Sequence, residues 1–447
     1  MKVSQTKDLT QGVPVRVLSV YALPMLISMF FQQAYNLVDA WIAGNYIGAV
    51  ALGAVGACYP VTVFLLAISA GLSLGISIFC SQAYGAKNYG TVKTAVNTAL
   101  MAYLPLSVGI SVIGFYLAPL LLKWLAVPAE AQSAALGYLR IYLLGFAFQF
   151  LYNICSGVMT GLGNSQGPLL FLIVSSVCNI VLDYVLVARL HFGVTGLALA
   201  TVMSQLFAAL FGMKTVAAAQ KALADRGARF SREILGSLIR LGVPSMIQQM
   251  LMSLGQLAMQ YVINGYGLIV MAGYSIAFRV NGLVINSLMA LSNALSGFIA
   301  QNQGAGKPER IRSGISASLF LSYLFSACVI LVLYTYSPQI LGFFLEDSAQ
   351  APQIISVGTS FLSVVAPFYL LVCAKIVFDG ALRGVGAMWA FMFSTMSDVF
   401  VRVLCGAPFS ARWGLGGVWA VWPTAWLIGT AMSVGLYLCH SHRHQKA

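Results

Sequence analysis

The chain has 447 residues, of which 60% are hydrophobic and only 8% are charged, and its net charge is +13. Soluble domains carry about 25% charged residues, so this composition excludes a water-soluble globule of the same length. The basic residues are dispersed over short polar segments, whereas nucleic-acid binding would gather them on one module. We therefore expect a lipid bilayer, and no nucleic acid, among the partners.

Glycine, proline and charged residues divide the chain into apolar segments that are long enough to span a membrane as helices. A first set of six predicted helices covers residues 14–43, 50–82, 92–122, 131–160, 166–188 and 193–219. A second set covers residues 235–265, 271–303, 311–342, 350–382, 387–409 and 413–439. The short alternating segments of a β-barrel are not seen. The sequence predicts an all-α integral membrane protein of about twelve transmembrane helices.

Basic residues predict the orientation of these helices. With a cytoplasmic N-terminus, seventeen of them lie in inside segments, and only Lys123, Arg189 and Arg412 lie in outside loops. This asymmetry satisfies the positive-inside rule. The polar N-terminus lacks the apolar core of a signal peptide. We expect a multi-pass protein of the cell (inner or plasma) membrane with both termini in the cytoplasm.

The second set of helices repeats motifs of the first. The matched motifs begin at Pro24 and Pro244, Gln82 and Gln301, Gly157 and Gly380, and Gly193 and Gly414. They predict two six-helix lobes, residues 1–219 and 235–447, the second with a short basic cytoplasmic tail, joined by a cytoplasmic loop over 220–234. Because six is even, the pseudo-two-fold axis should run along the membrane normal, a geometry that suits alternating access.

Two of the four acids within the predicted spans have basic neighbours. Lys375 and Arg383 lie four residues either side of Asp379, and Arg402 lies four residues after Asp398. Helical side chains at this spacing can touch. We interpret these residues as neutralised pairs that hold the second lobe together, with a role in ion coupling as the alternative.

The other two acids, Asp39 and Asp183, have no basic residue one helical turn away. Asp39 shares a helix face with the polar side chains of Gln32, Tyr35 and Asn36, and Asp183 shares one with Asn179. Charged groups inside a membrane are costly, and they often mark ion pathways. These acids are candidates to bind a proton or a cation, although spacing alone does not show that their helices meet.

Several further motifs carry a family resemblance. They are Asn36-Leu-Val-Asp39-Ala-Trp-Ile-Ala-Gly44, Gln82-Ala-Tyr-Gly-Ala with Gln301-Asn-Gln-Gly-Ala-Gly306, Gly157-x3-Gly161-Leu-Gly163-Asn164 with Leu382-Arg383-Gly384, Asn179-x3-Asp183, and Gly193-x2-Gly196-x3-Ala200-Thr201. Together, in this order and duplicated, they make the chain resemble the multidrug and toxic compound extrusion (MATE) family over essentially its whole length.

The resemblance implies an antiporter that exports amphipathic, often cationic drugs or toxins in exchange for H⁺ or Na⁺ by alternating access. It implies neither an enzyme nor a cofactor, and no metal beyond Na⁺. The family's first-lobe cation site corresponds here to Asp39, Asn179, Asp183, Thr201 and the backbone of Leu197. We expect a monomer.

Two predictions accompany this site. The polar stripe of Gln32, Tyr35 and Asn36 lies beside it along the first helix, and Asn153 lies on the fourth helix, so we expect these four side chains to line the drug-binding cleft. Pro24 removes a backbone hydrogen bond from the first helix, and we expect a hinge there.

One branch of the family, the NorM-like branch, also carries acids in the seventh and tenth helices. Here the seventh helix offers only neutral polar groups, namely Gln248, Gln249, Gln256, Gln260 and Asn264. In the tenth helix the acid of that branch would lie near Val372, about two turns before Asp379. We therefore expect the first lobe to carry ion coupling alone.

Other functions remain alternatives at this point. A lipid-linked oligosaccharide flippase shares the two-lobe plan but needs a cationic cavity, and few basic residues lie at membrane depth. They are Arg140, Arg279, Lys375 and Arg402. An intramembrane metalloenzyme needs clustered His residues or acids, and a fixed channel does not need two rocking lobes.

Overall fold

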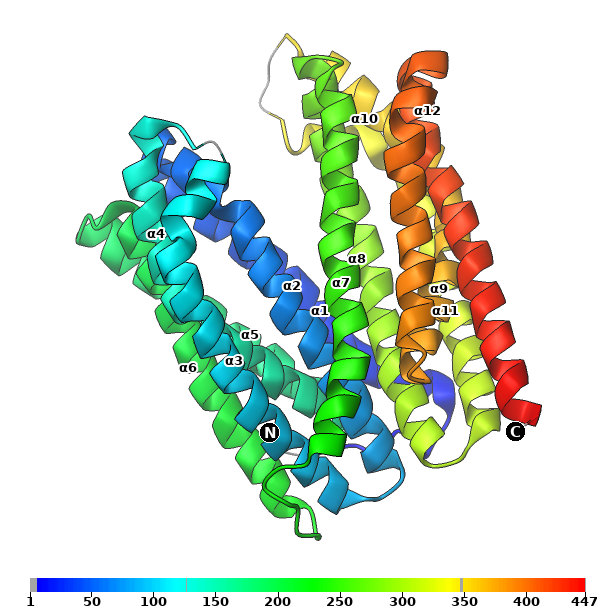
Figure 1. Ribbon diagram of the computed structural model, residues 1–447. Helices are drawn as coiled ribbons and strands as arrows, with labels where there is room; N and C mark the ends of the chain where they lie inside the picture. Colours follow the sequence, from blue (N-terminus) through cyan, green and yellow to red (C-terminus); the bar gives the residue numbers. More distant parts are fainter. Residues whose placement is uncertain (1–5, 126, 346–348, 447) are drawn as a thin grey trace. The chain divides into compact units, whose positions relative to one another are not determined.

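The computed structural model describes residues 6–125, 127–345 and 349–446, and it is helical almost throughout, with no strand among these residues (Figure 1). The helices of the first half are α1 (Pro14–Tyr46), α2 (Ala49–Gly85), α3 (Tyr89–Trp124), α4 (Ala129–Gly161), α5 (Gln166–Asp183) and α6 (Gly193–Ala222). A π-helix, η1 (Tyr184–Arg189), extends α5 directly.

The second half contains α7 (Arg232–Asn264), α8 (Leu268–Gly304), α9 (Pro308–Gly342), α10 (Ala351–Val365), α11 (Tyr369–Gly384) and α12 (Met388–Lys446). The 3₁₀ turn η2 (Ala366–Phe368) joins α10 to α11, so these two form a single long segment with Pro367 at its break. Gly414 has non-helical backbone angles inside α12, which divides α12 into two helices.

Ten helical segments of the described chain are long and apolar enough to cross a membrane. One of them is α12, which the break at Gly414 divides in two. The remaining long helix, α7, is more polar, because it carries the row of glutamines and Asn264. The prediction of an all-α, polytopic membrane protein is confirmed, and most helix ends lie within a few residues of the predicted ones.

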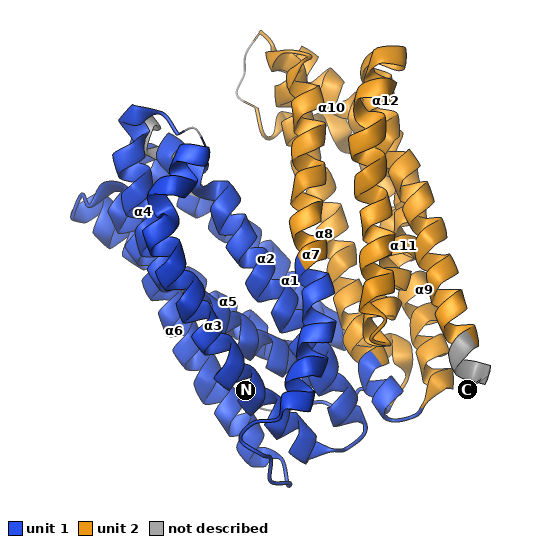
Figure 2. Ribbon diagram, viewed as in Figure 1, with its two compact units in different colours: residues 1–11, 20–246, 300–306 blue, residues 12–19, 247–299, 307–447 orange. Residues whose placement is uncertain are grey.

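The chain forms two compact units, shown in Figure 2. Unit 1 comprises residues 1–11, 20–246 and 300–306, and unit 2 comprises residues 12–19, 247–299 and 307–447. The division between the units lies within α7, after the polar loop at 220–234 that the sequence analysis assigns to the linker. The start of α7 belongs with unit 1 because Met246 and Gly242 pack directly against α2.

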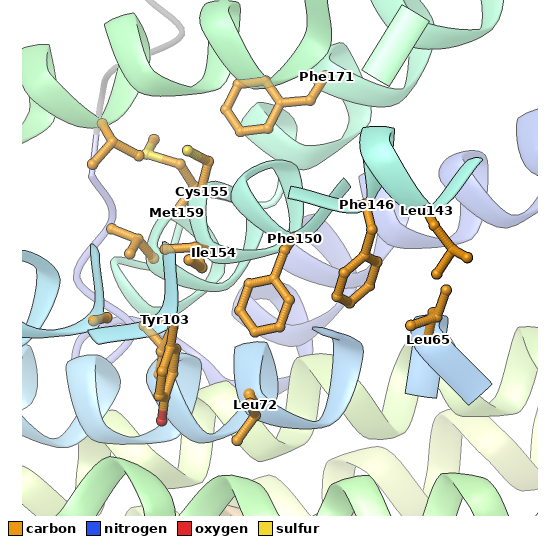
Figure 3. Close-up of a cluster of buried hydrophobic side chains, with 14 of the residues drawn as sticks. Leu65, Leu72, Tyr103, Leu143, Phe146, Phe150, Ile154, Cys155, Met159 and Phe171 are labelled. Carbon is orange, nitrogen blue, oxygen red and sulfur yellow. The ribbon is translucent and has the colours of Figure 1, made fainter. Parts of the chain in front are cut away.

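The core of unit 1 is built around α4. Phe146 and Phe150 are fully buried and meet edge to face, and Tyr103 of α3 packs against Phe150 (Figure 3). Small residues bring the helices close, as is usual in membranes. A Cβ atom at Gly157 of α4 would lie only 2.5 Å from the carbonyl oxygen of Ser73 in α2. Helix α4 also packs against α5 and α6, which carry part of the candidate site.

The segment before α1 contacts both the last turn of α8 and the end of α4, within unit 1. The backbone N–H of Leu9 donates to Gln301 Oε1 at 2.9 Å, and the N–H of Lys7 donates to the carbonyl of Leu162 at 3.1 Å. Gly85 and Gly304 allow α2 and α8 to touch, because a side chain at either would overlap the backbone of the other helix. The duplicated glutamine–glycine motifs therefore form the contact at which α2 and α8 cross.

Candidate functional site

The candidate ion site begins on α5, a helix with two different faces. Val177 and Val181 are more than half exposed, as suits a lipid-facing surface, whereas Asn179 and Asp183 are buried within unit 1. The spacing of four residues places the last two on the same face, as predicted. Asp183 is the final residue of α5, and η1 follows it at once. Such π-helical turns are frequent at functional sites.

The amide of Asn179 links α5 to α6. In the orientation that satisfies both neighbours, its nitrogen donates to Asp183 Oδ2 at 2.8 Å and its oxygen accepts from the backbone N–H of Thr201 at 3.3 Å. The Thr201 hydroxyl donates in turn to the carbonyl of Leu197 at 3.0 Å. A carboxylate, an amide, a hydroxyl and a backbone carbonyl are thus connected through α5 and α6.

Asp39 of α1 completes this cluster. Its carboxyl group lies within interaction reach of that of Asp183, although the two residues lie 144 positions apart in the chain. Two carboxylates at close range repel each other, so a proton or a cation between them is favoured. Oδ1 of each acid has no further hydrogen-bond partner among the described residues. The structure therefore brings together all five residues that the sequence proposed as a cation site.

Two tyrosines surround the paired acids. The hydroxyls of Tyr35 on α1 and Tyr138 on α4 both lie within electrostatic reach of Asp39 and Asp183. Tyr138 stacks on Tyr142, whose hydroxyl donates to Gln149 Oε1 at 3.0 Å. Sequence reasoning included Tyr35 but missed Tyr138. The only signal for it was a second tyrosine four residues later on the same helix face.

The other proposed substrate-lining residues have different surroundings. Gln32 and Asn36 have exposed side chains one turn apart on α1. Asn153 is half-buried, and its amide donates to the carbonyl of Gln149 at 2.9 Å and to Ser69 Oγ at 3.4 Å. It therefore contributes to the packing of α4 against α2. Gln32 and Asn36 are the more accessible candidates.

Pro24, the proposed hinge, lies within a continuous α1. The hydroxyl of Ser28 donates to the Pro24 carbonyl at 2.8 Å, one turn later on the same helix. The preceding turn is fixed to α4, because the Tyr21 hydroxyl donates to the carbonyl of Thr160 at 2.6 Å. A bend at Pro24 would thus move the segment that carries Asp39 relative to an anchored base.

Unit 2 differs from unit 1 because its buried acids are neutralised. Lys375 Nζ lies 2.7 Å from Asp379 Oδ2, and Arg402 lies 2.9 Å from Asp398 Oδ2, with all four side chains buried. Both predicted ion pairs are confirmed. Arg383 instead donates to Asn293 at 2.8 Å and to Ser292 at 2.7 Å.

The MatE family model matches residues 24–185 and 244–408, which is one match in each half of the duplicated chain. The chain belongs to the MATE family. It is therefore a multi-pass transporter, a class of protein that is not enzymatic.

Relatives within this family cover nearly the whole chain. It is 29% identical to "Probable multidrug resistance protein YoeA" of Bacillus subtilis (strain 168), over 94% of this chain and 93% of that protein. It is 24% identical to "Multidrug export protein MepA" of Staphylococcus aureus (strain N315), over 94% and 92% of the two chains.

Solved structures of MATE transporters share the fold. An outward-facing multidrug resistance MATE transporter of the MOP superfamily matches with a TM-score of 0.91 and 24% identity, covering 99% of this chain and 100% of that one. A MOP superfamily transporter from Pyrococcus furiosus, described as having a binding pocket of reverse polarity, matches with a TM-score of 0.87 and 24% identity, covering 98% of each chain.

Proposed function

We propose that this MATE protein exports amphipathic, often cationic small molecules from the cell in exchange for inward-moving H⁺ or Na⁺. The observation that carries the proposal is the cluster of Asp39 and Asp183 with Asn179 and Thr201, in which Asp183 is fully buried and no basic side chain of the described residues neutralises either acid. Family membership, and the names of the relatives that cover the chain, support drug export.

The chemistry of the cluster suits either ion. Carboxylate, amide, hydroxyl and carbonyl oxygens are hard ligands of the kind that bind Na⁺, and two touching carboxyl groups can take up protons. Binding of either ion removes the repulsion between Asp39 and Asp183. Since Asp39 lies beyond Pro24 on α1, we propose that ion binding changes the bend of this helix and that drug release follows.

The flippase alternative receives less support. Recognition of a pyrophosphate needs cationic side chains that are free to bind it. Two of the four deep basic residues, Lys375 and Arg402, are already held by carboxylates at 2.7 and 2.9 Å. We also propose that the protein works as a monomer in the plasma membrane. We propose that both termini lie in the cytoplasm, because the distribution of basic residues favours that orientation.

Ethidium transport by inside-out vesicles, in which efflux from the cytoplasmic face appears as uptake into the lumen, tests the function directly. We expect efflux to respond to an imposed gradient of H⁺ or of Na⁺, and we expect Asp39→Asn and Asp183→Asn to fold and bind ethidium without that response. Asp225→Asn, the same change at an exposed loop acid, is the matched control and should behave as wild type. Gradient-driven efflux at the wild-type rate in both site variants would show that coupling lies elsewhere.

A further inference from the structure

The two units can be aligned residue by residue through their glycines. Gly163 and Gly386 precede α5 and α12, and both have a positive φ, of 75° and 80°. Gly193 is the first residue of α6, Gly414 marks the start of the second part of α12, and both have a φ of 57°. Positive φ is uncommon in helical proteins outside glycine. These four positions therefore match α5 to the first part of α12, and α6 to the second part.

A helix contact that occurs in both units supports the same alignment. A Cβ atom at Gly157 would lie 2.5 Å from the Ser73 carbonyl oxygen, and one at Gly380 would lie 2.8 Å from the Ser292 carbonyl oxygen. Gly157 precedes Gly163 by six residues, and Gly380 precedes Gly386 by six. The sequence repeat is thus also a repeat of packing.

The alignment assigns a unit 2 counterpart to each side chain of the ion cluster. The counterparts of Asp39, Asn179, Asp183 and Thr201 are, in that order, Met259, Arg402, Gly406 and Trp422. Met259 follows from the match of Pro24 with Pro244, and the other three follow from the matched glycines.

These counterparts meet in unit 2 as their partners meet in unit 1. A Cβ atom at Gly406 would lie 3.4 Å from the Met259 sulfur, which reproduces the contact between the two acids of unit 1. The Arg402 guanidinium lies 4.0 Å from the ring centroid of Trp422, which reproduces the contact of Asn179 with Thr201. Unit 2 therefore contains the same site with different chemistry.

The difference in chemistry is a fixed positive charge. Met259 and Gly406 provide no carboxylate, and the amide of unit 1 is replaced by a guanidinium, which is always protonated in proteins. Asp398 balances this charge from one turn earlier on α12, at 2.9 Å. Its counterpart on α5 is Ser175, so unit 2 has gained the cation and its counter-charge together.

We propose that Arg402 is a tethered cation, which fills permanently the unit 2 counterpart of the site at which unit 1 binds its mobile ion. Unit 2 is then held in the equivalent of an ion-bound state, and only unit 1 exchanges ions during transport. The inference rests on the proposed function, because it assumes that the unit 1 cluster binds the coupling ion.

The first experiment converts the tethered site into an exchangeable one. The triple variant Asp398→Ser, Arg402→Asn, Gly406→Asp copies Ser175, Asn179 and Asp183 of unit 1. It replaces the ion pair of Asp398 and Arg402, which has no net charge, by one carboxylate. In proteoliposomes with the membrane potential clamped at zero, the ethidium gradient that stops net flux is measured against a tenfold gradient of the driving ion. We expect the variant to move one ion more per cycle, which raises the balancing ethidium gradient about tenfold.

The second experiment removes the cation without creating an unpaired charge. The neutral pair Asp398→Asn, Arg402→Gln should fold and bind ethidium but lose gradient-driven efflux to the level of Asp39→Asn. Arg402→Lys keeps a tethered cation and should keep both efflux and the wild-type balancing gradient. Wild-type efflux in the neutral pair would overturn the inference, and so would failure of this pair to fold, because folding would then be the role of Arg402.

The triple variant tests the inference independently of the neutral pair. If it folds and balances at the wild-type ethidium gradient, the counterpart site is not an ion site and the inference is wrong. If it does not fold, efflux by the double variant Asp398→Asn, Arg402→Gln tests the inference instead. Failure of the proposed function is distinguishable, because wild-type efflux would then ignore both ion gradients, whereas failure of this inference alone leaves the wild-type response intact.

Discussion

Replacing Asp379 with asparagine should destabilise unit 2 by about 3–5 kcal/mol, the usual cost of removing one partner from a buried ion pair. The Asp379 carboxylate holds Lys375 Nζ at 2.7 Å and accepts hydrogen bonds from Ser394 at 2.9 Å and from Ser433 at 2.6 Å. Asparagine keeps the shape of this side chain but leaves the buried ammonium of Lys375 without a counter-charge.

The loss of stability distinguishes the contribution of the Asp379 charge from that of its hydrogen bonds. Ser394→Ala removes one hydrogen bond to a charged group, which costs about 1.5–3 kcal/mol, and leaves the ion pair in place. The double variant Lys375→Met, Asp379→Leu removes both charges, and its stability should return close to that of wild type, because an apolar pair of similar volume avoids the desolvation of two ions.

Chemical unfolding of the purified protein in mild detergent measures these differences as a double-mutant cycle. Efflux of ethidium from vesicles, assayed in parallel, addresses the alternative role in ion coupling. If Asp379→Asn unfolds as wild type does but loses its response to ion gradients, Asp379 belongs to the coupling machinery and the scaffold interpretation is refuted.

Three further predictions concern packing, substrate and topology. Gly157→Val should lower stability by about 1–3 kcal/mol in the same unfolding assay, because its side chain would enter the α2 backbone, whereas Gly109→Val, in open space, should not. Gln32→Ala and Asn36→Ala should alter the pattern of drug resistance in growth assays at unchanged protein level. A uniform loss that follows lower expression would indicate packing instead. A reporter fused after Ala447 should be active only in the cytoplasm, and periplasmic activity would contradict the orientation.

Local pattern was sufficient to predict much of the fold and the shared helix face of Asn179 and Asp183. A transmembrane helix must satisfy its own backbone hydrogen bonds, so each apolar segment had one possible structure. The spacing of Asn179 and Asp183 placed both on one face of α5, and both are buried there. The ion pairs of α11 and α12 followed from the same helical geometry.

Contacts between helices could not be derived in this way. The meeting of Asp39 with Asp183 depends on the packing of α1 against α5, which no spacing within either helix encodes. Tyr138 was missed for the same reason, since its importance comes from the helices it faces. The division of the chain inside α7 likewise depends on contacts of Met246 with Gly71, far apart in sequence.

The departure of α5 from the repeat lies at the functional cluster. Gly193 lies thirty positions after Gly163, but Gly414 lies only twenty-eight positions after Gly386. The additional residues coincide with η1, the π-helix that starts directly after Asp183, because a π-helical turn accommodates extra residues without ending the helix. The start of α6 in unit 1 therefore still corresponds to the start of the second part of α12 in unit 2. The extra residues widen the end of α5 next to Asp183, the acid that faces Asp39. Of the two matched segments, α5 with its π-helical extension lies beside the unneutralised acids, whereas the first part of α12, which carries a fixed guanidinium, retains the shorter connection.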